Sequence, residues 1–291
     1  MALFQFLGKF KYAFALSKSI LTFFNKYRII HVIQLGDGCM KFTVRETIAL
    51  VSAVLCYFVL PIIVAVPVMM IGMMQGGAID PTELAMPAWT LNAIMIVSFA
   101  FLIVLAIVLL IVYRRFLIDE WKKVIAKPLR FVLISIIGII VFVGFQYIIG
   151  FFIPESGANQ QLIEDINQQM PWLMGIQAVI LAPFVEEMIF RKVLYMHLKG
   201  KGQLSIDAFK TKTTAKGGAL IRVIALMISS SLLFGLMHFG FGTDPWFMII
   251  PYFTMGLLLV ISYEVSQMFY VPVIIHFANN LLSVLMMLFL H

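Results

Sequence analysis

The stretch Leu181-Ala-Pro-Phe-Val-Glu-Glu-Met-Ile-Phe-Arg191 places three charged side chains inside a hydrophobic run from Trp172 to Met196. A run of this length is sufficient to cross a bilayer, which takes about 20 residues of helix. Insertion scales assign a cost of roughly 2.5–3.5 kcal/mol to each ionised side chain near the membrane centre. Three such side chains are therefore expected only where the fold or the function needs them. We infer that this segment is a transmembrane helix around which the chain is organised.

The three charges of this helix divide into a pair and a single carboxylate. Glu187 and Arg191 are four residues apart with the acid on the N-terminal side, the favourable order for an ion pair along a helix. Glu186 points about 100° away around the helix and has no cationic partner at helical spacing. We therefore expect Glu187 and Arg191 to stabilise the fold and Glu186 to be available for chemistry.

The composition predicts an all-α, polytopic transmembrane helical bundle. Of the 291 residues 62% are hydrophobic and only 12% are charged, whereas about a quarter of the residues of a soluble domain are charged. The formal net charge is +7, but the basic residues gather in particular loops. Nucleic acid is therefore not expected as a partner, and membrane lipids are.

The hydrophobic pattern predicts about seven spans, within a range of six to eight, and three regions of the chain. Residues 1–45 mix apolar and basic residues and predict one or two amphipathic helices on the cytoplasmic membrane surface, with a solvated basic tail as the alternative. Residues 46–153 hold three spans, and residues 154–291 hold the catalytic transmembrane core. The predicted spans are Ile48–Met74, Trp89–Val112, Phe131–Ile153, Trp172–Met196, Leu220–Phe239, Trp246–Ile261 and Val271–Leu290.

The charges of the long loops predict the orientation of the bundle. Loops 75–88 and 154–171 are acidic, whereas loops 113–130 and 197–218 are basic. Basic loops remain in the cytoplasm, so the N-terminus is expected there as well. We expect a multi-pass protein of the bacterial plasma membrane.

Two histidines within the predicted spans complete a candidate site with Glu186. His238 lies one helical turn after Phe234, and His276 lies one turn before Asn280. Polar groups at membrane depth almost always turn inward to meet one another. We therefore expect two imidazoles, a carboxylate and an amide to meet in one buried cavity. The neighbouring Asn279 is the more natural helix-contact residue.

This inventory suits the activation of water, in either of two ways. Glu186 would act as the general base. His238 and His276, with Glu186, would be the ligands of a zinc ion that keeps an open position for water. Alternatively, without a metal, the two histidines and Asn280 would donate hydrogen bonds to a developing oxyanion. These residues are compatible with both the zinc-bound and the metal-free mechanism.

Three motifs together resemble the CPBP family of CAAX prenyl endopeptidases and bacteriocin-processing (Abi) proteins. They are Glu-Glu-x-x-x-Arg at 186–191, Phe-x-x-x-His at 234–238 and His-x-x-x-Asn at 276–280. The resemblance covers about 172–290. It implies an intramembrane endopeptidase in which Glu186 activates water and His238, His276 and Asn280 are catalytic. It also implies that Glu187, Arg191 and Phe234 support the site.

The expected substrate is a membrane-associated peptide, either a bacteriocin or signalling-peptide leader or a prenylated CAAX tail. A membrane protein partner is also compatible with the sequence. The rival hypothesis is a non-proteolytic bacteriocin-immunity or scaffold protein that regulates a partner, and a transporter with a proton-relay carboxylate is a third. The sequence has no His-Glu-x-x-His and no Gly-x-Ser-x-Gly motif, which argues against two other intramembrane protease chemistries.

One geometric difficulty accompanies this site. Strict alternation of straight spans places His238 near the outer end of its span and His276 near the inner end of its own. A shared site demands similar depth in the membrane. Tilting, or a broken segment at Asp244-Pro245, Pro251 or Gly256, would bring the two histidines together, because broken backbone is tolerated where it lines a cavity.

Overall fold

The computed structural model describes residues 88–153, 157, 163–164, 168, 170–199, 215–240 and 244–289. All regular structure in these residues is helical, as the composition predicts. The expected surface segment 1–45 and the expected span Ile48–Met74 lie outside the described residues. The elements are α5 (Ala88–Val112), α6 (Arg114–Ala126), α7 (Pro128–Phe152), α9 (Pro171–Gly175), η2 (Ile176–Leu181), α10 (Ala182–Glu187), η3 (Met188–Met196), α11 (His197–Lys199), α12 (Ala215–His238), η5 (Trp246–Met248), α13 (Ile249–Ser266) and α14 (Tyr270–Phe289).

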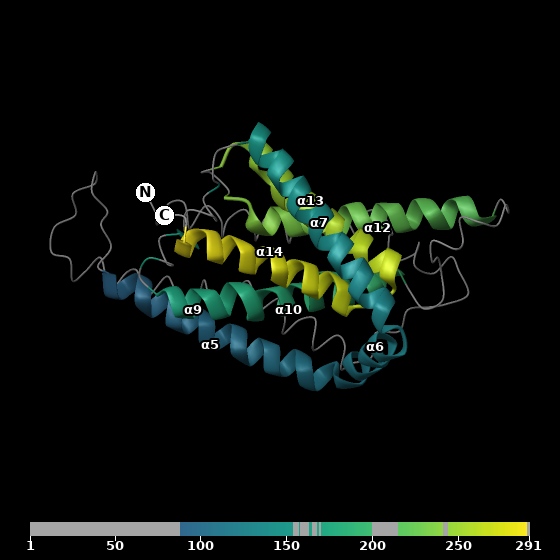
Figure 1. The fold of residues 1–291 in the computed structure, drawn as a ribbon, viewed down its shortest axis with the longest axis horizontal. Coiled ribbons are helices and arrows are strands. Elements are labelled where there is room, and N and C mark those ends of the chain that lie inside the picture. The colour runs from purple at the N-terminus through teal and green to yellow at the C-terminus, as the bar shows by residue number, and fades with distance from the viewer. Residues whose placement is uncertain are drawn as a thin grey trace, which may run out of the picture.

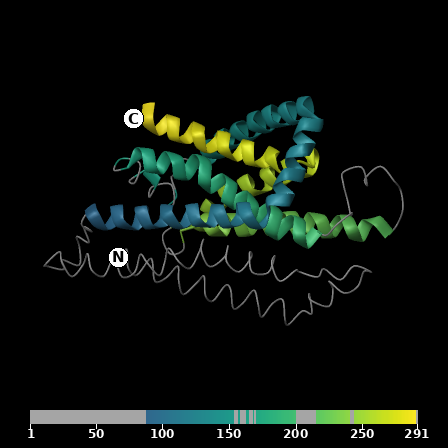
Figure 2. The same ribbon diagram turned by 90° about the horizontal axis from the view of Figure 1, so that it is seen from below.

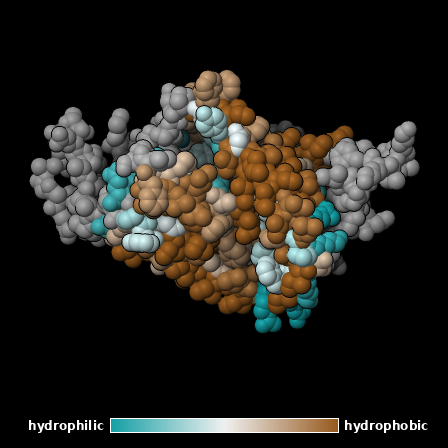
Figure 3. Space-filling model, in the orientation of Figure 1, coloured by the Kyte–Doolittle hydropathy of each residue, from teal (hydrophilic) through white to brown (hydrophobic). Residues whose placement is uncertain are grey.

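Five helices of the described residues are long and apolar enough to cross a membrane, and the predicted helical bundle is thereby confirmed. α12 is different, because its apolar part, Val223–His238, is shorter than a full span. Large hydrophobic side chains are exposed on the outer faces of these helices, and Figure 3 shows a largely hydrophobic surface. Such a surface is typical of helices that face lipid. The five spans are Met95–Val112, Pro128–Phe152, Pro171–Met196, Trp246–Ser266 and Tyr270–Phe289.

The charged helix lies at the centre of the described fold. It runs without interruption from α9 to α11, and it packs between α5 and α14 (Figure 1). α12 and α13 form a closely packed pair, and α7 crosses α13 and α14 obliquely. The view from below in Figure 2 shows α5 and α14 on opposite sides of the central helix. Side chains of the central helix can therefore meet side chains of α12 and α14.

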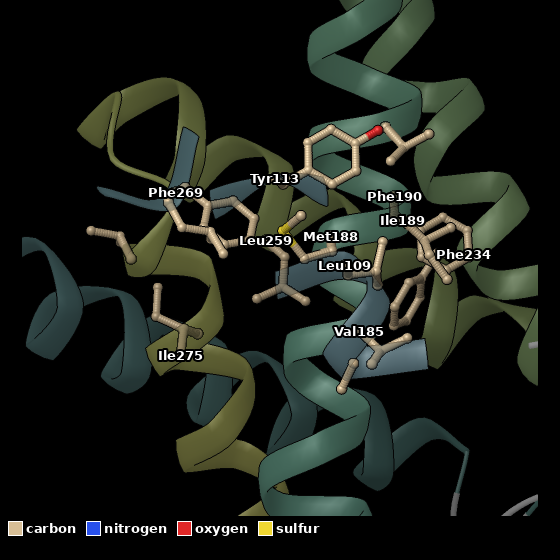
Figure 4. Close-up of a cluster of buried hydrophobic side chains, with 14 of the residues drawn as sticks. Leu109, Tyr113, Val185, Met188, Ile189, Phe190, Phe234, Leu259, Phe269 and Ile275 are labelled. Carbon is tan, nitrogen blue, oxygen red and sulfur yellow. The ribbon is translucent and has the colours of Figure 1, made fainter. Parts of the chain in front are cut away.

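A single large hydrophobic cluster holds the charged segment in place. Val185 and Met188 flank the two glutamates and are fully buried. Around them the cluster draws on every long described helix, and Figure 4 shows part of it. The surrounding cluster residues labelled there are Leu109, Tyr113, Ile189, Phe190, Phe234, Leu259, Phe269 and Ile275.

The central helix widens into π-helical turns on both sides of the glutamates. η2 precedes α10 and η3 follows it. The N–H of Ala182 bonds to the carbonyl of Gln177, five residues earlier rather than four. Pro183 has no N–H to give to the carbonyl of residue 179, so the regular helical hydrogen bond is absent there and the helix has a widened turn. π turns occur frequently at functional sites.

The chain is interrupted between α12 and α13. α12 ends at His238, and Pro245 is extended, with φ −63° and ψ 148°. The N–H of Gly240 donates to the carboxylate of Asp244 at 2.7 Å, which closes a turn before α13 begins. Of the three alternative places for a broken segment, Asp244-Pro245 is the one at which the helix is interrupted. Pro251 lies in the first turn of α13 and Gly256 lies inside that helix.

Small residues let α12 and α13 approach closely. A Cβ added at Gly256 would lie 3.0 Å from Cα of Ser231 and 3.1 Å from Cβ of Phe234. Ser231 is thus the small residue of α12 at this close approach. Ser230 also donates to the carbonyl of Phe190 at 3.2 Å and so joins α12 to the central helix. This contact positions the end of α12 that carries His238.

Candidate active site

Three helices bring Glu186, His238 and His276 together. Oε2 of Glu186, in α10, lies 3.7 Å from Nε2 of His238 and 3.8 Å from Nε2 of His276. The side chains of Glu186 and His276 are 5% and 2% exposed, whereas that of His238 is 18% exposed. The group is therefore buried among the helices, and the end of α12 is its most accessible side.

Both imidazoles are held through their other ring nitrogen. Nδ1 of His238 lies 2.9 Å from the carbonyl oxygen of Phe234, and Nδ1 of His276 lies 3.3 Å from Oε1 of Glu187. A carbonyl and a carboxylate can only accept, so both Nδ1 atoms carry a proton. A neutral ring then directs the lone pair of Nε2 towards Glu186, and only a protonated ring directs an N–H there.

A second layer of charge supports His276 from within the central helix. Nε of Arg191 lies 2.8 Å from Oε2 of Glu187, and both side chains are fully buried. The expected ion pair is therefore present. The guanidinium also lies over the ring of Phe234, 5.6 Å from its centroid, and its terminal nitrogens have no hydrogen-bond partner among the described residues. Glu187 thus contacts both Arg191 and His276, and its charge balances that of the buried guanidinium.

Two aromatic rings enclose His238. Phe234 is stacked on one face of the imidazole, with centroids 4.6 Å apart, and Tyr252 of α13 is stacked near the other, with centroids 5.0 Å apart. Phe234 also contacts His276 edge-on at 5.9 Å. Tyr252 was not among the residues predicted from the sequence. An aromatic residue within an apolar span has no sequence signal that distinguishes a site contact from ordinary packing.

Asn280 occupies a different place from the other predicted residues. Its Nδ2 donates to the carbonyl of Ala178 in η2 at 2.8 Å, so that it joins α14 to a π turn of the central helix. Asn279 donates to Oδ1 of Asn280 at 3.2 Å. The expectation that Asn279 is the helix-contact residue is therefore wrong, because Asn280 makes the contact between helices. One N–H of the Asn280 amide remains for another acceptor.

The geometry of Glu186, His238 and His276 does not match a ready-formed metal centre. A tetrahedral zinc with bonds of about 2.0–2.1 Å keeps its ligand atoms about 3.3 Å apart, which is shorter than the two distances observed here. Among the parts of the chain that the structure describes, no group of three or more His, Cys, Asp or Glu side chains could hold a metal ion.

A buried acid near the other end of α13 was also missed. Glu264 lies beyond the predicted end of its span, but α13 continues to Ser266 and buries it. Both carboxylate oxygens contact Nζ of Lys199, at 2.6 and 2.7 Å, and Tyr195 donates to Oε1 at 2.9 Å. This cluster anchors the end of the central helix to α13. Lys199 is thus a packing residue as well as part of a basic loop.

Comparisons with known proteins place similarity in the same part of the chain. Residues 168–282 match the family described as type II CAAX prenyl endopeptidase Rce1-like. MroQ, a membrane-embedded CAAX protease of Staphylococcus aureus USA300, is 25% identical over 152 residues, 50% of this chain and 54% of that protein. YdiL of Bacillus subtilis 168, provisionally described as a membrane peptidase, is 30% identical over 138 residues, 47% of this chain and 46% of that protein. The chain thus matches about half the length of these curated relatives, and no solved structure matches it significantly.

Proposed function

We propose, from the match of residues 168–282 to the type II CAAX prenyl endopeptidase family and from the similarity to two bacterial relatives, that this protein is an intramembrane endopeptidase of the CPBP type in which Glu186 activates water. The observation that carries the proposal is the approach of Oε2 of Glu186 to Nε2 of His238 and of His276, at 3.7 and 3.8 Å. Two separations of this size leave room for a water molecule that donates one O–H to the Glu186 carboxylate and the other to the Nε2 lone pair of one histidine. A water oxygen in that position would be within reach of a general base.

In the first step, the water is held by Glu186 and by the Nε2 atom of a histidine. One O–H of the water donates to the carboxylate, and the other donates to the lone pair that Nε2 presents because Nδ1 holds the ring proton. Glu186 takes the first proton while the water oxygen forms a bond to the carbonyl carbon of the peptide. The carbonyl oxygen becomes an oxyanion.

In the second step, the tetrahedral intermediate collapses. The C–N bond of the peptide breaks, and the amine nitrogen receives the proton that Glu186 took from the water. The remaining N–H of Asn280 is a candidate donor to the oxyanion, together with Nε2–H of whichever histidine is protonated. Burial of these groups strengthens each such contact, because the effective dielectric constant is low.

The proposed substrate is a peptide that reaches the site from the membrane, such as a leader peptide or a prenylated tail. Support comes from the position of His238, the most exposed member of the group, at the end of α12 beside the link to α13. MroQ, one of the similar proteins, carries the description of a CAAX protease. A non-proteolytic immunity or scaffold role is the alternative outcome of the test.

The test compares cleavage by the purified full-length protein and its variants in lipid nanodiscs. Candidate leader and prenylated peptides are incubated with each protein, and the products are identified by mass spectrometry. We expect Glu186→Gln to lower the rate about 10²–10⁴-fold, the usual contribution of a general base. Asp119→Asn removes an equal charge from the exposed surface of α6 and should not change the rate.

Equal cleavage by the wild type and by Glu186→Gln would contradict the mechanism. If no peptide is cleaved and the cellular phenotype of a deletion is complemented equally well by Glu186→Gln and by His276→Asn, the protein is a binding or scaffold protein. Thermal unfolding of each variant shows whether a loss of cleavage reflects a loss of the fold.

A further inference from the structure

Helix α6 joins two predicted spans and carries an excess of positive charge. Residues 113–130 contain six basic and two acidic side chains, a net charge of +4. All six basic side chains are exposed. Lys123 contacts Glu120, Arg130 donates to the carbonyl of Val265, and Lys122 pairs with Asp119 on the surface. Within the described part of the chain, no ionic partner faces the remaining three: Arg114, Arg115 and Lys127.

The side chains of α6 form three faces. One face packs into the protein through Leu117, Glu120 and Val124, which are buried. A second face exposes apolar side chains at helical spacing, Ile118, Trp121 and Ile125, with exposures of 48, 51 and 64%. The third face is polar and holds Arg115, Asp119 and Lys122. An exposed apolar stripe beside a basic stripe is the pattern of a helix that lies in the headgroup region of a bilayer.

The ends of the neighbouring spans place α6 in the headgroup region of the bilayer. α5 ends at Val112, just before α6 begins, and α7 begins at Pro128, just after α6 ends. Trp121 meets the ring of Tyr270 edge-on at 5.5 Å at the start of α14, and tryptophan and tyrosine gather at membrane interfaces. In Figure 3 hydrophilic residues project from the lower right of a mostly hydrophobic surface, where α6 lies in Figure 1.

From these observations we propose that α6 is a binding site for anionic phospholipids of the bilayer. The apolar stripe of Ile118, Trp121 and Ile125 enters the acyl region, and Arg114, Arg115, Lys122 and Lys127 bind headgroup phosphates. Each basic residue near an anionic surface contributes about fivefold to binding. The site does not involve Glu186 or the histidines, so it stands independently of the proposed peptidase activity.

The bound lipid would also support the link before α14. Oε2 of Glu120 accepts the N–H of Phe269 at 2.8 Å, and Nζ of Lys123 donates to the carbonyl of Gln267 at 3.3 Å. The hydroxyl of Tyr270 donates to the carbonyl of Leu117 at 3.2 Å. Lipids that fix α6 in the interface would therefore fix the start of the helix that carries His276.

Quenching of Trp121 fluorescence by brominated lipids tests the proposal. The full chain with Trp89, Trp172 and Trp246 replaced by Phe keeps Trp121 as its sole tryptophan. It is reconstituted into phosphatidylcholine vesicles that contain equal fractions of dibrominated phosphatidylglycerol or of dibrominated phosphatidylcholine. We expect the anionic lipid to quench at least about twofold more strongly at low salt, and the difference to shrink as salt screens the charges. Replacement of Arg114, Arg115, Lys122 and Lys127 by Gln should abolish the difference while leaving quenching by phosphatidylcholine.

Two controls accompany the measurement. A chain with Trp246 as its sole tryptophan reports on η5, at the other end of α13, and should be quenched equally by the two lipids. Asp119→Asn should preserve or increase the preference at Trp121. Equal quenching of Trp121 by both lipids would overturn the proposal. Absence of quenching by either lipid would overturn it as well, because protein would then cover the apolar stripe.

Discussion

The imidazole of His238 lies nearly parallel to the phenol ring of Tyr252, with centroids 5.0 Å apart and planes inclined by 17°. Tyr252 belongs to α13, whereas His238 is the last residue of α12, where a helix end would ordinarily fray. With Phe234 on the other face, the ring has little freedom to rotate. The direction of Nε2 towards Glu186 therefore depends on α13 as well as on α12.

Tyr252→Leu should lower peptide cleavage by up to about tenfold. Stacked aromatic pairs contribute about 0.5–1.5 kcal/mol, and 1.36 kcal/mol corresponds to a tenfold change in rate. Tyr252→Phe keeps the ring and should retain most of the activity. Steady-state cleavage rates at saturating peptide check the prediction. An equal loss in both variants would show that the hydroxyl, rather than the stacked ring, is required.

Glu187→Gln should destabilise the protein strongly, because it leaves the fully buried Arg191 without its charge partner. Breaking one side of a buried pair costs about 3–5 kcal/mol. The double variant Glu187→Gln/Arg191→Met should recover most of that stability in thermal unfolding. Activity should remain low in the double variant, because a neutral amide in place of the Glu187 carboxylate holds the Nδ1 proton of His276 less firmly. Full recovery of cleavage would contradict the positioning role of Glu187.

Gly256→Ala should destabilise the α12–α13 pair. The new methyl group would lie 3.0–3.2 Å from backbone atoms of Ser231 and from Cβ of Phe234, which cannot move without moving α12. Overpacking of this kind costs on the order of 1–3 kcal/mol. Gly144→Ala in α7 is the matched control, because no heavy atom lies within 4 Å of the added Cβ. Its midpoint of thermal unfolding should be unchanged or slightly higher, and an equal fall in both variants would contradict the prediction.

Removal of divalent metals should leave cleavage unchanged. The proposed steps use only Glu186, the two histidines and Asn280. Dialysis against 1,10-phenanthroline, followed by metal analysis and a cleavage assay, checks this outcome. Loss of activity that returns on addition of zinc would contradict the prediction. The distances from Oε2 of Glu186 to Nε2 of His238 and of His276 would then have to shorten by about 0.5 Å to reach the spacing of tetrahedral zinc ligands.

Hydrophobicity and spacing predicted the helical bundle and the pairing of Glu187 with Arg191. Both follow from local rules, because a charge in a hydrophobic run must be paired and helical neighbours are four residues apart. The meeting of His238 and His276 at Glu186 was expected from the cost of polar groups in lipid. That expectation requires no knowledge of which helices are neighbours.

Features that depend on contacts between helices could not be predicted from the sequence. Tyr252 and Glu264 act through partners on other helices, and neither has a neighbour in sequence that reveals its role. Asn279 and Asn280 differ by one position, and only the packing of α14 against η2 decides which one reaches Ala178. The π turns are likewise a result of packing, since Pro183 predicts an irregularity but not its form.

The widened turns of the central helix divide it into three segments, α9, α10 and α11, whose side chains are rotated relative to one another. A π turn holds one residue more than an α turn, so the side chains that follow it are rotated by about 100° relative to an unbroken α-helix. η2 and η3 each introduce such an offset, one before the glutamates and one after them. The deletion of a single residue from η2 would leave every motif intact in the sequence and yet turn Glu186 away from both histidines.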